Sequence, residues 1–215
     1  MSAEPGLRER KKEQTRKVIA ETAYGLFRDR GFDAVTVAEV ARAAGVSEGT
    51  VFNYFPAKED LFYNQMEVFE AALVDAVRAR PPGEPVVAAF RRFMLERSRG
   101  LADEARADVI ATAARIIEGS DVLQARERVI VARATQAIAD LIVEETRAPE
   151  RNVEAWVVAN ALMGVQRALG QYVRSAALAG RSGPSLEKDV RSRGRRAFER
   201  LEQGLADYAV KPSST

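Results

Sequence analysis

The sequence contains no cysteine and no histidine. Their absence excludes disulfides, thiolate or imidazole metal sites, cysteine nucleophiles and Ser-His triads. It also removes the commonest general base and the Glu-x-x-His pairs of di-iron helical bundles. The phosphate-binding patterns GxxxxGK[ST] and GxGxxG are both missing. A carboxylate or lysine mechanism stays open, but no motif marks one, so we expect neither an enzyme nor a cofactor.

Long apolar runs are missing as well. None approaches the ~18 residues of a membrane span, and the N-terminus lacks the apolar segment of a signal peptide. We therefore expect a cytoplasmic protein without a membrane partner. The net charge of +2 gives no bulk signal for a nucleic-acid partner. Basic side chains do gather between Arg8 and Lys17, which fits either phosphate contacts or a solvated helix start.

Apolar residues recur at helical spacing through most of the chain, and no stretch alternates as a strand would. The pattern predicts an all-α fold of about nine helices. Their approximate ranges are 7–30, 36–45, 47–54, 57–80, 84–102, 105–117, 121–146, 152–178 and 185–208. Phe27, Phe32, Val40 and Val51 are the expected core of the first three helices. Phe32 is expected to fold back onto Phe27 in a Schellman stop at Gly31.

Residues 36–58, TVAEVARAAGVSEGTVFNYFPAK, carry the most specific local signals. Thr36 and Glu39 form a predicted capping box, and Gly45 is a left-handed helix stop. Ser47 can cap a second short helix, which Pro56 ends. Two short helices around a tight glycine turn predict a helix-turn-helix. Any small helical hairpin gives a similar pattern, so spacing alone leaves both readings open.

The longer string VTVAEVARAAGVSEGTVFNYFPAKEDLF resembles the DNA-binding segment of the TetR/AcrR family of bacterial transcriptional regulators. The positions that carry the resemblance are Thr36, Ala41, Gly45, Thr50, Phe52, Tyr54, Phe55, Lys58 and Leu61. It implies a DNA-binding helix-turn-helix domain over residues 7–56 and a helical ligand-binding and dimerisation domain over 57–209. Residues 1–6 and 210–215 are expected to be disordered. Phe52 replaces a more usual tyrosine, and Ala57 replaces a more usual capping Ser or Thr.

If the second short helix enters the major groove, Asn53 can read adenine and Glu48 can accept from cytosine N4. Thr50, Tyr54 and Lys58 suit phosphates, which set register rather than sequence. Gly49 allows close approach, and the helix opened by Thr36 can hold a phosphate at its N-terminus. The predicted DNA-binding residues are Thr36, Ser47, Glu48, Gly49, Thr50, Asn53, Tyr54 and Lys58. The alternative is that 47–54 is a frayed, solvent-facing turn.

The resemblance also implies a pocket for a small hydrophobic effector and a two-helix dimer interface. The candidate pocket residues are Met66, Phe69, Phe90, Phe93, Met94, Ile110, Arg115, Trp156, Met163 and Gln166, with Arg115 or Gln166 as a polar handle. The candidate interface residues are Leu162, Leu169, Tyr172, Leu186, Val190, Ala197, Leu201 and Leu205. For both sets the alternative is plain core within one chain, which is the commoner meaning of a Met and aromatic stripe at helical spacing.

The resulting hypothesis is a homodimeric repressor that binds a palindromic operator in double-stranded DNA and is released by an unknown small molecule. A helical protein-protein adaptor that does not bind DNA is the alternative. Binding that weakens steeply with salt would separate the two, because only phosphate contacts release condensed counterions.

Overall fold

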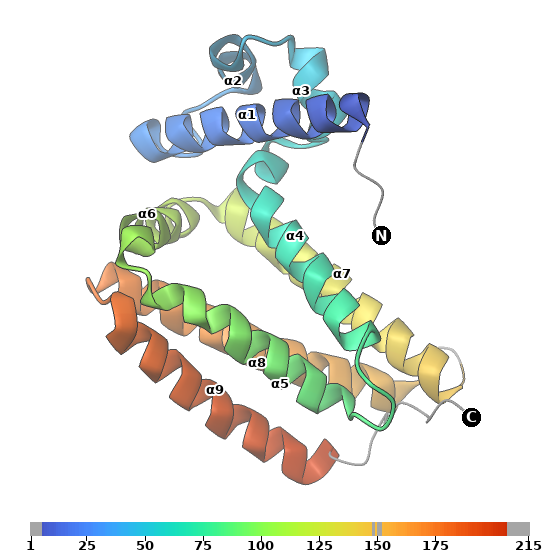
Figure 1. The fold of residues 1–215 in the computed structure, drawn as a ribbon. Coiled ribbons are helices and arrows are strands. Elements are labelled where there is room, and N and C mark those ends of the chain that lie inside the picture. The colour runs from blue at the N-terminus through green and yellow to red at the C-terminus, as the bar shows by residue number, and fades with distance from the viewer. Residues whose placement is uncertain (1–5, 148, 150–151, 206–215) are drawn as a thin grey trace. The chain divides into compact units, whose positions relative to one another are not determined.

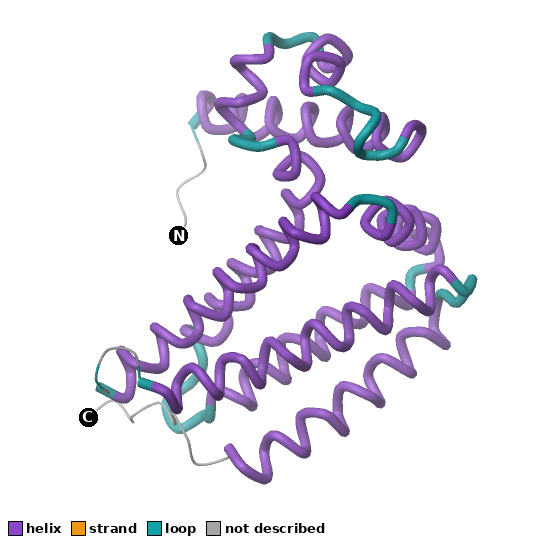
Figure 2. The backbone as a smooth tube through the Cα atoms, turned by 180° about the vertical axis from the view of Figure 1, so that it is seen from behind, coloured by secondary structure: helices purple, strands orange, loops and turns teal. Residues whose placement is uncertain are grey.

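The computed structural model describes residues 6–147, 149 and 152–205. The expected disordered ends, and the predicted continuation of the last helix to residue 208, fall outside these ranges apart from Gly6. The described residues form nine α-helices, two short 3-10 helices and no strand, which confirms the all-α prediction (Figures 1 and 2). The helices are α1 (Leu7–Arg30), α2 (Val37–Ala44), α3 (Glu48–Tyr54), α4 (Lys58–Arg78), α5 (Val86–Arg97), η1 (Ser98–Ala102), η2 (Glu104–Arg106), α6 (Ala107–Glu118), α7 (Asp121–Thr146), α8 (Val153–Leu178) and α9 (Gly183–Leu205).

The chain divides into two compact units. The first comprises the described residues up to Glu67 together with Arg115–Glu127, and the second comprises Val68–Ala114 and the described residues from Arg128 onwards. Helix α4 therefore contributes to both units. The predicted domain boundary at residue 56 stays a prediction.

The core of the first unit lies where α1 packs against α2 and α3. Phe27, Val40 and Val51 are at most 1% exposed, and Phe32 is 4% exposed, as the sequence predicted. The rings of Phe27 and Phe32 lie 5.0 Å apart between centroids. The predicted Schellman geometry is wrong, however. Gly31 has φ 82° and an extended ψ of 158°, and its N–H donates one hydrogen bond, to the Phe27 carbonyl. Essentially only glycine adopts this backbone conformation, so it is the residue that ends α1 here.

The turn between α6 and α7 belongs to this first unit. The Ser120 hydroxyl donates to Asp33 Oδ1 at 3.0 Å. The Tyr63 hydroxyl donates to the Leu123 carbonyl at 3.0 Å, and Tyr63 is only 3% exposed. These bonds join positions 87 and 60 residues apart in sequence, so a segment from the middle of the chain is built into the N-terminal unit.

In the second unit α5, η1 and α8 pack against α9 around a core that includes Phe90, Leu162 and Phe198, each 0% exposed. The buried Arg80 closes the α4–α5 turn. Its guanidinium donates to the Val77 and Glu84 carbonyls and pairs with Glu145 at 2.5 Å, so the buried charge is fully matched. Among the helices described, none is both long enough and apolar enough to span a bilayer.

Candidate nucleic-acid interface

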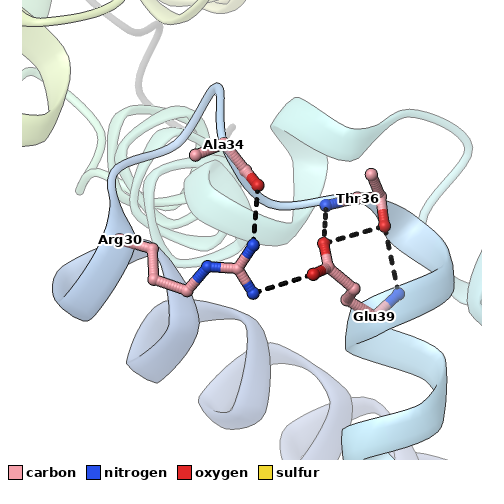
Figure 3. A network of polar contacts seen from close by, with 4 residues as sticks. All are labelled: Arg30, Ala34, Thr36 and Glu39. Atoms are coloured by element: carbon pink, nitrogen blue, oxygen red, sulfur yellow. Dashed lines mark hydrogen bonds and ion pairs between the residues drawn. The ribbon is translucent and has the colours of Figure 1, made fainter.

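Helix α2 begins with a complete capping box, as predicted (Figure 3). The Thr36 hydroxyl accepts from the Glu39 N–H at 3.2 Å, and Glu39 Oε2 accepts from the Thr36 N–H at 2.8 Å. Arg30 binds the other Glu39 oxygen at 2.8 Å and donates to the Ala34 carbonyl. Hydrogen bonds from the Thr36 backbone, Arg30 and the Thr36 hydroxyl lower the pKa of Glu39 to about 2. The polar groups of Thr36 are thus engaged within the protein, and its proposed phosphate contact stays a prediction.

A tight turn joins α2 to α3. Gly45 adopts the left-handed conformation, φ 69° and ψ 33°, and the Val46 N–H returns to the Ala41 carbonyl at 3.0 Å. Ser47 then caps α3, because its hydroxyl oxygen accepts from the Thr50 N–H at 3.1 Å. Gly45 thus ends α2 and Ser47 begins α3, with one residue between them. Two short helices joined by so tight a turn have the local geometry of a helix-turn-helix.

Helix α3 separates into a buried and an exposed side. Val51 and Phe55 are each 1% exposed and face the core. The opposite side carries exposed polar residues and a glycine: Ser47, Glu48, Gly49 and Asn53. Of the other predicted DNA-binding residues on this segment, Thr50 and Tyr54 are half-buried. The exposed side can therefore offer both donors and acceptors to another molecule.

Arg16 of α1 holds the C-terminal end of α3. Its Nη1 donates to the Tyr54 carbonyl at 2.9 Å, and its guanidinium lies 4.5 Å from the centroid of the Phe55 ring. This bond satisfies a carbonyl that the helix leaves without a partner, and the positive charge suits the helix C-terminus. The contact spans 38 residues, and no local pattern in the sequence marks it.

Lys58, at the start of α4, is more engaged than the sequence suggested. Its Nζ lies 4.2 Å from the centroid of the Phe32 ring. Burial lowers the pKa of Lys58, although the negative charges of Asp33, Glu59 and Glu39 act to raise it. The cap that Ala57 was expected to lack is supplied by Asp60, whose Oδ2 accepts from the Ala57 N–H at 3.0 Å. Asp60 is 4% exposed and its other oxygen pairs with Arg126 of α7 at 2.5 Å.

Most of the candidate pocket residues lie in the second unit. Phe90 and Met163 are buried in its main apolar cluster, against which Phe93, Met94 and Trp156 pack half-buried. The rings of Phe69 and Phe93 lie 5.4 Å apart between centroids. Among the described residues, none donates a hydrogen bond to the buried Gln166 Oε1. Ile110 is half-buried on α6, whereas Met66 and the exposed Arg115 belong to the first unit.

The candidate interface residues divide by burial. Leu162, Leu186, Val190 and Leu169 are at most 8% exposed within one chain. Tyr172, Ala197 and Leu201 are half-buried, and the side chain of Leu205 lies outside the described part. A groove of about 490 Å³ runs between α8 and α9, lined by Ala161, Gly164, Val165, Ala168, Leu169, Tyr172, Arg193 and Ala197.

One end of this groove is fixed by polar contacts. The Tyr172 hydroxyl donates to Asp189 at 3.1 Å and accepts from Arg181 at 2.8 Å. The guanidinium of Arg193 stacks 4.3 Å from the centroid of the Tyr172 ring. Leu169, Tyr172 and Ala197 of this groove were among the predicted interface residues. The small residues Ala161, Gly164 and Ala168 were not, although their i, i+3, i+7 spacing was an available signal.

The geometry of α2 and α3 defines a helix-turn-helix protein. Residues 19–63 match the sequence profile described as bacterial regulatory proteins, tetR family. Residues 19–63 therefore carry the N-terminal domain that this family shares.

Similarity to individual relatives is confined to part of the chain. It is 35% identical over 80 residues to the HTH-type transcriptional regulator TcmR of Streptomyces glaucescens, covering 37% of this chain and 35% of TcmR. It is 32% identical over 77 residues to AcrR of Shigella flexneri, covering 34% of this chain and 36% of AcrR. In both cases the similarity spans about a third of the relative's own length.

The likeness of fold extends further. SmeT, the repressor of a Stenotrophomonas maltophilia multidrug efflux pump, superposes in its triclosan complex with a TM-score of 0.57 over 94% of this chain and 96% of SmeT. The sequence identity is 16%, so the comparison concerns the fold alone.

Proposed function

We propose that this protein is a DNA-binding transcriptional regulator, a homodimeric repressor that a small hydrophobic ligand releases from a palindromic operator. The observation that carries the proposal is the exposed side of α3, which presents Ser47, Glu48, Gly49 and Asn53 to solvent. Hydrogen bonds hold both ends of this helix, from the Ser47 cap at its start and from Arg16 at its end. In a helix-turn-helix this is the side that enters the major groove. The relatives TcmR and AcrR are HTH-type transcriptional regulators, which supports the same function here.

Within the groove, Asn53 pairs its amide with adenine and Glu48 accepts from cytosine N4. Thr50, Tyr54 and Lys58 face the phosphates on either side and fix the register of the helix. Binding of a small molecule releases the repressor only if the molecule favours one spacing of the two DNA-binding heads over the other. SmeT has been solved with triclosan, so a protein of this fold holds a small molecule.

A second copy of the chain is expected on the α8–α9 face. Val153 and Val157 of α8 are 74% and 60% exposed, and the small residues of the groove continue the same side of the helix. Small side chains let two helices approach closely, and packing of this face around a two-fold axis makes a four-helix bundle. Two copies then present two α3 helices to the two halves of a palindrome.

The first experiment is selection of bound fragments from random DNA, followed by salt titration of the winning site. The expected result is a two-fold symmetric site whose affinity falls steeply with salt, and Asn53→Ala should relax specificity at one base pair. Gln136→Ala, at an exposed amide side chain of α7 outside both α3 and the α8–α9 face, is the control and should bind as the wild type does. A folded protein that enriches no sequence would refute the proposal and favour the helical adaptor.

A further inference from the structure

The exposed side of α3 carries one aromatic ring for which the protein has no evident use. Phe52 is 47% exposed, and in the described part of the chain neither an aromatic ring nor a cation stacks on it. The other exposed large apolar side chains described are all valines, and they lie outside α2 and α3. A phenyl ring that is 47% exposed leaves about half of the possible gain from burial unrealised.

The neighbourhood of the ring is open. Along the helix Phe52 follows Glu48 by four residues and Gly49 by three, so the three share one side. A Cβ added to Gly49 would meet only the Ser47 hydroxyl, at 3.8 Å, so no contact inside the protein requires glycine there. Glycine costs a helix ~1 kcal/mol relative to alanine. Gly49 and the Phe52 ring therefore form a small exposed apolar surface among side chains that can form hydrogen bonds.

This inference rests on the proposed function and adds one element of its specificity. A phenyl ring cannot hydrogen-bond a phosphate, which removes the sequence-independent role that a tyrosine hydroxyl could fill here. In the major groove the one apolar group on a base edge is the C5-methyl of thymine, and phenylalanine is among the residues that contact it. We propose that the Phe52 ring contacts the C5-methyl of a thymine in each operator half-site.

A protein partner is the other occupant to consider. A stable protein interface buries about 800 Å² on each side. One ring bounded by the exposed polar residues Glu48 and Asn53 is far smaller than that. The thymine methyl, in contrast, matches both the size and the chemistry of the surface.

The test removes the methyl from the DNA rather than the ring from the protein. Each thymine of the selected operator is replaced in turn by deoxyuridine, and affinity is measured by fluorescence anisotropy at fixed salt. Wild type should lose roughly fourfold in affinity at one thymine per half-site, the loss that one buried methyl predicts. Phe52→Ala should bind the unmodified site more weakly and show no further loss at that position.

Two controls make the test specific. Phe52→Leu keeps an apolar side chain and should retain part of the deoxyuridine effect, while Val68→Ala, at a 59% exposed valine of α4, should retain all of it. Alanine is the better helix former, so weaker binding by Phe52→Ala does not come from loss of α3. Tight binding with no deoxyuridine effect, or the same effect in Phe52→Ala, overturns this inference alone. Failure to enrich any operator overturns the proposed function instead.

Discussion

At the scale of single residues, Arg16 joins α1 to the C-terminal end of α3. It satisfies the last carbonyl of α3 and stacks on Phe55, so Arg16→Met should lower the free energy of unfolding of the first unit by roughly 1–2 kcal/mol. Operator affinity should fall, but the slope of log affinity against log salt should stay unchanged, because no phosphate contact is removed. Arg133→Met, at an exposed arginine of α7 in the second unit, is the control; a shallower slope for Arg16→Met would mean that Arg16 binds phosphate directly.

Glu39 should make stability depend on pH in the acid range. Its pKa is lowered from 4.5 to about 2 in the folded protein, so the carboxylate stabilises the fold above about pH 4.5. That contribution is lost as the pH falls towards 2. The difference in melting temperature between wild type and Glu39→Gln should therefore be full at pH 7 and shrink between pH 4.5 and 2. A difference that is constant over this range would contradict the assignment; circular dichroism measures it.

At the scale of elements, two glycines should respond oppositely to the same substitution. Gly45 has a positive φ of 69°, and an added Cβ meets no atom within 4 Å, so Gly45→Ala should cost roughly 1–2 kcal/mol through the backbone alone. Gly25 lies within α1 with equally open surroundings, and Gly25→Ala should stabilise by roughly 1 kcal/mol. Urea unfolding checks both, and a change of the same sign in the two variants would refute the argument.

The elements themselves were largely predictable from the sequence. Capping residues and apolar periodicity are local signals, so Thr36, Gly45 and Ser47 located the ends of α2 and α3 correctly. The contacts that tie elements together were not predictable, because they join residues far apart without a shared pattern. Arg16 with Tyr54 and Ser120 with Asp33 are of this kind. Apolar periodicity also cannot distinguish residues buried within one chain from residues at a dimer interface. Leucines of both kinds recur at the same helical spacing.

At the scale of the whole molecule, the proposed dimer should depend on the small residues of the α8–α9 groove. Ala168 is exposed and lines the groove, so Ala168→Glu places a charge where the second copy is expected to pack. Size-exclusion chromatography with light scattering should give twice the 23.6 kDa of one chain for wild type and a single chain for the variant.

The matched control is Ala71→Glu, at an exposed alanine of α4, which should leave the mass unchanged. The Ala168→Glu variant should keep its helical circular dichroism but lose tight operator binding, because one α3 helix reads only half a palindrome. A variant that stays dimeric would move the interface away from this groove.

The single tryptophan gives the molecule a built-in optical probe. Trp156 is half-buried against the apolar cluster that contains Phe90 and Met163, where the effector is expected to bind. A hydrophobic compound entering there would change the polarity around one indole and shift its emission, with no second tryptophan to dilute the signal. The absence of cysteine allows a second optical probe, because one engineered cysteine can be labelled with a fluorophore at a single site. Compound libraries can therefore be screened by fluorescence before any operator is known.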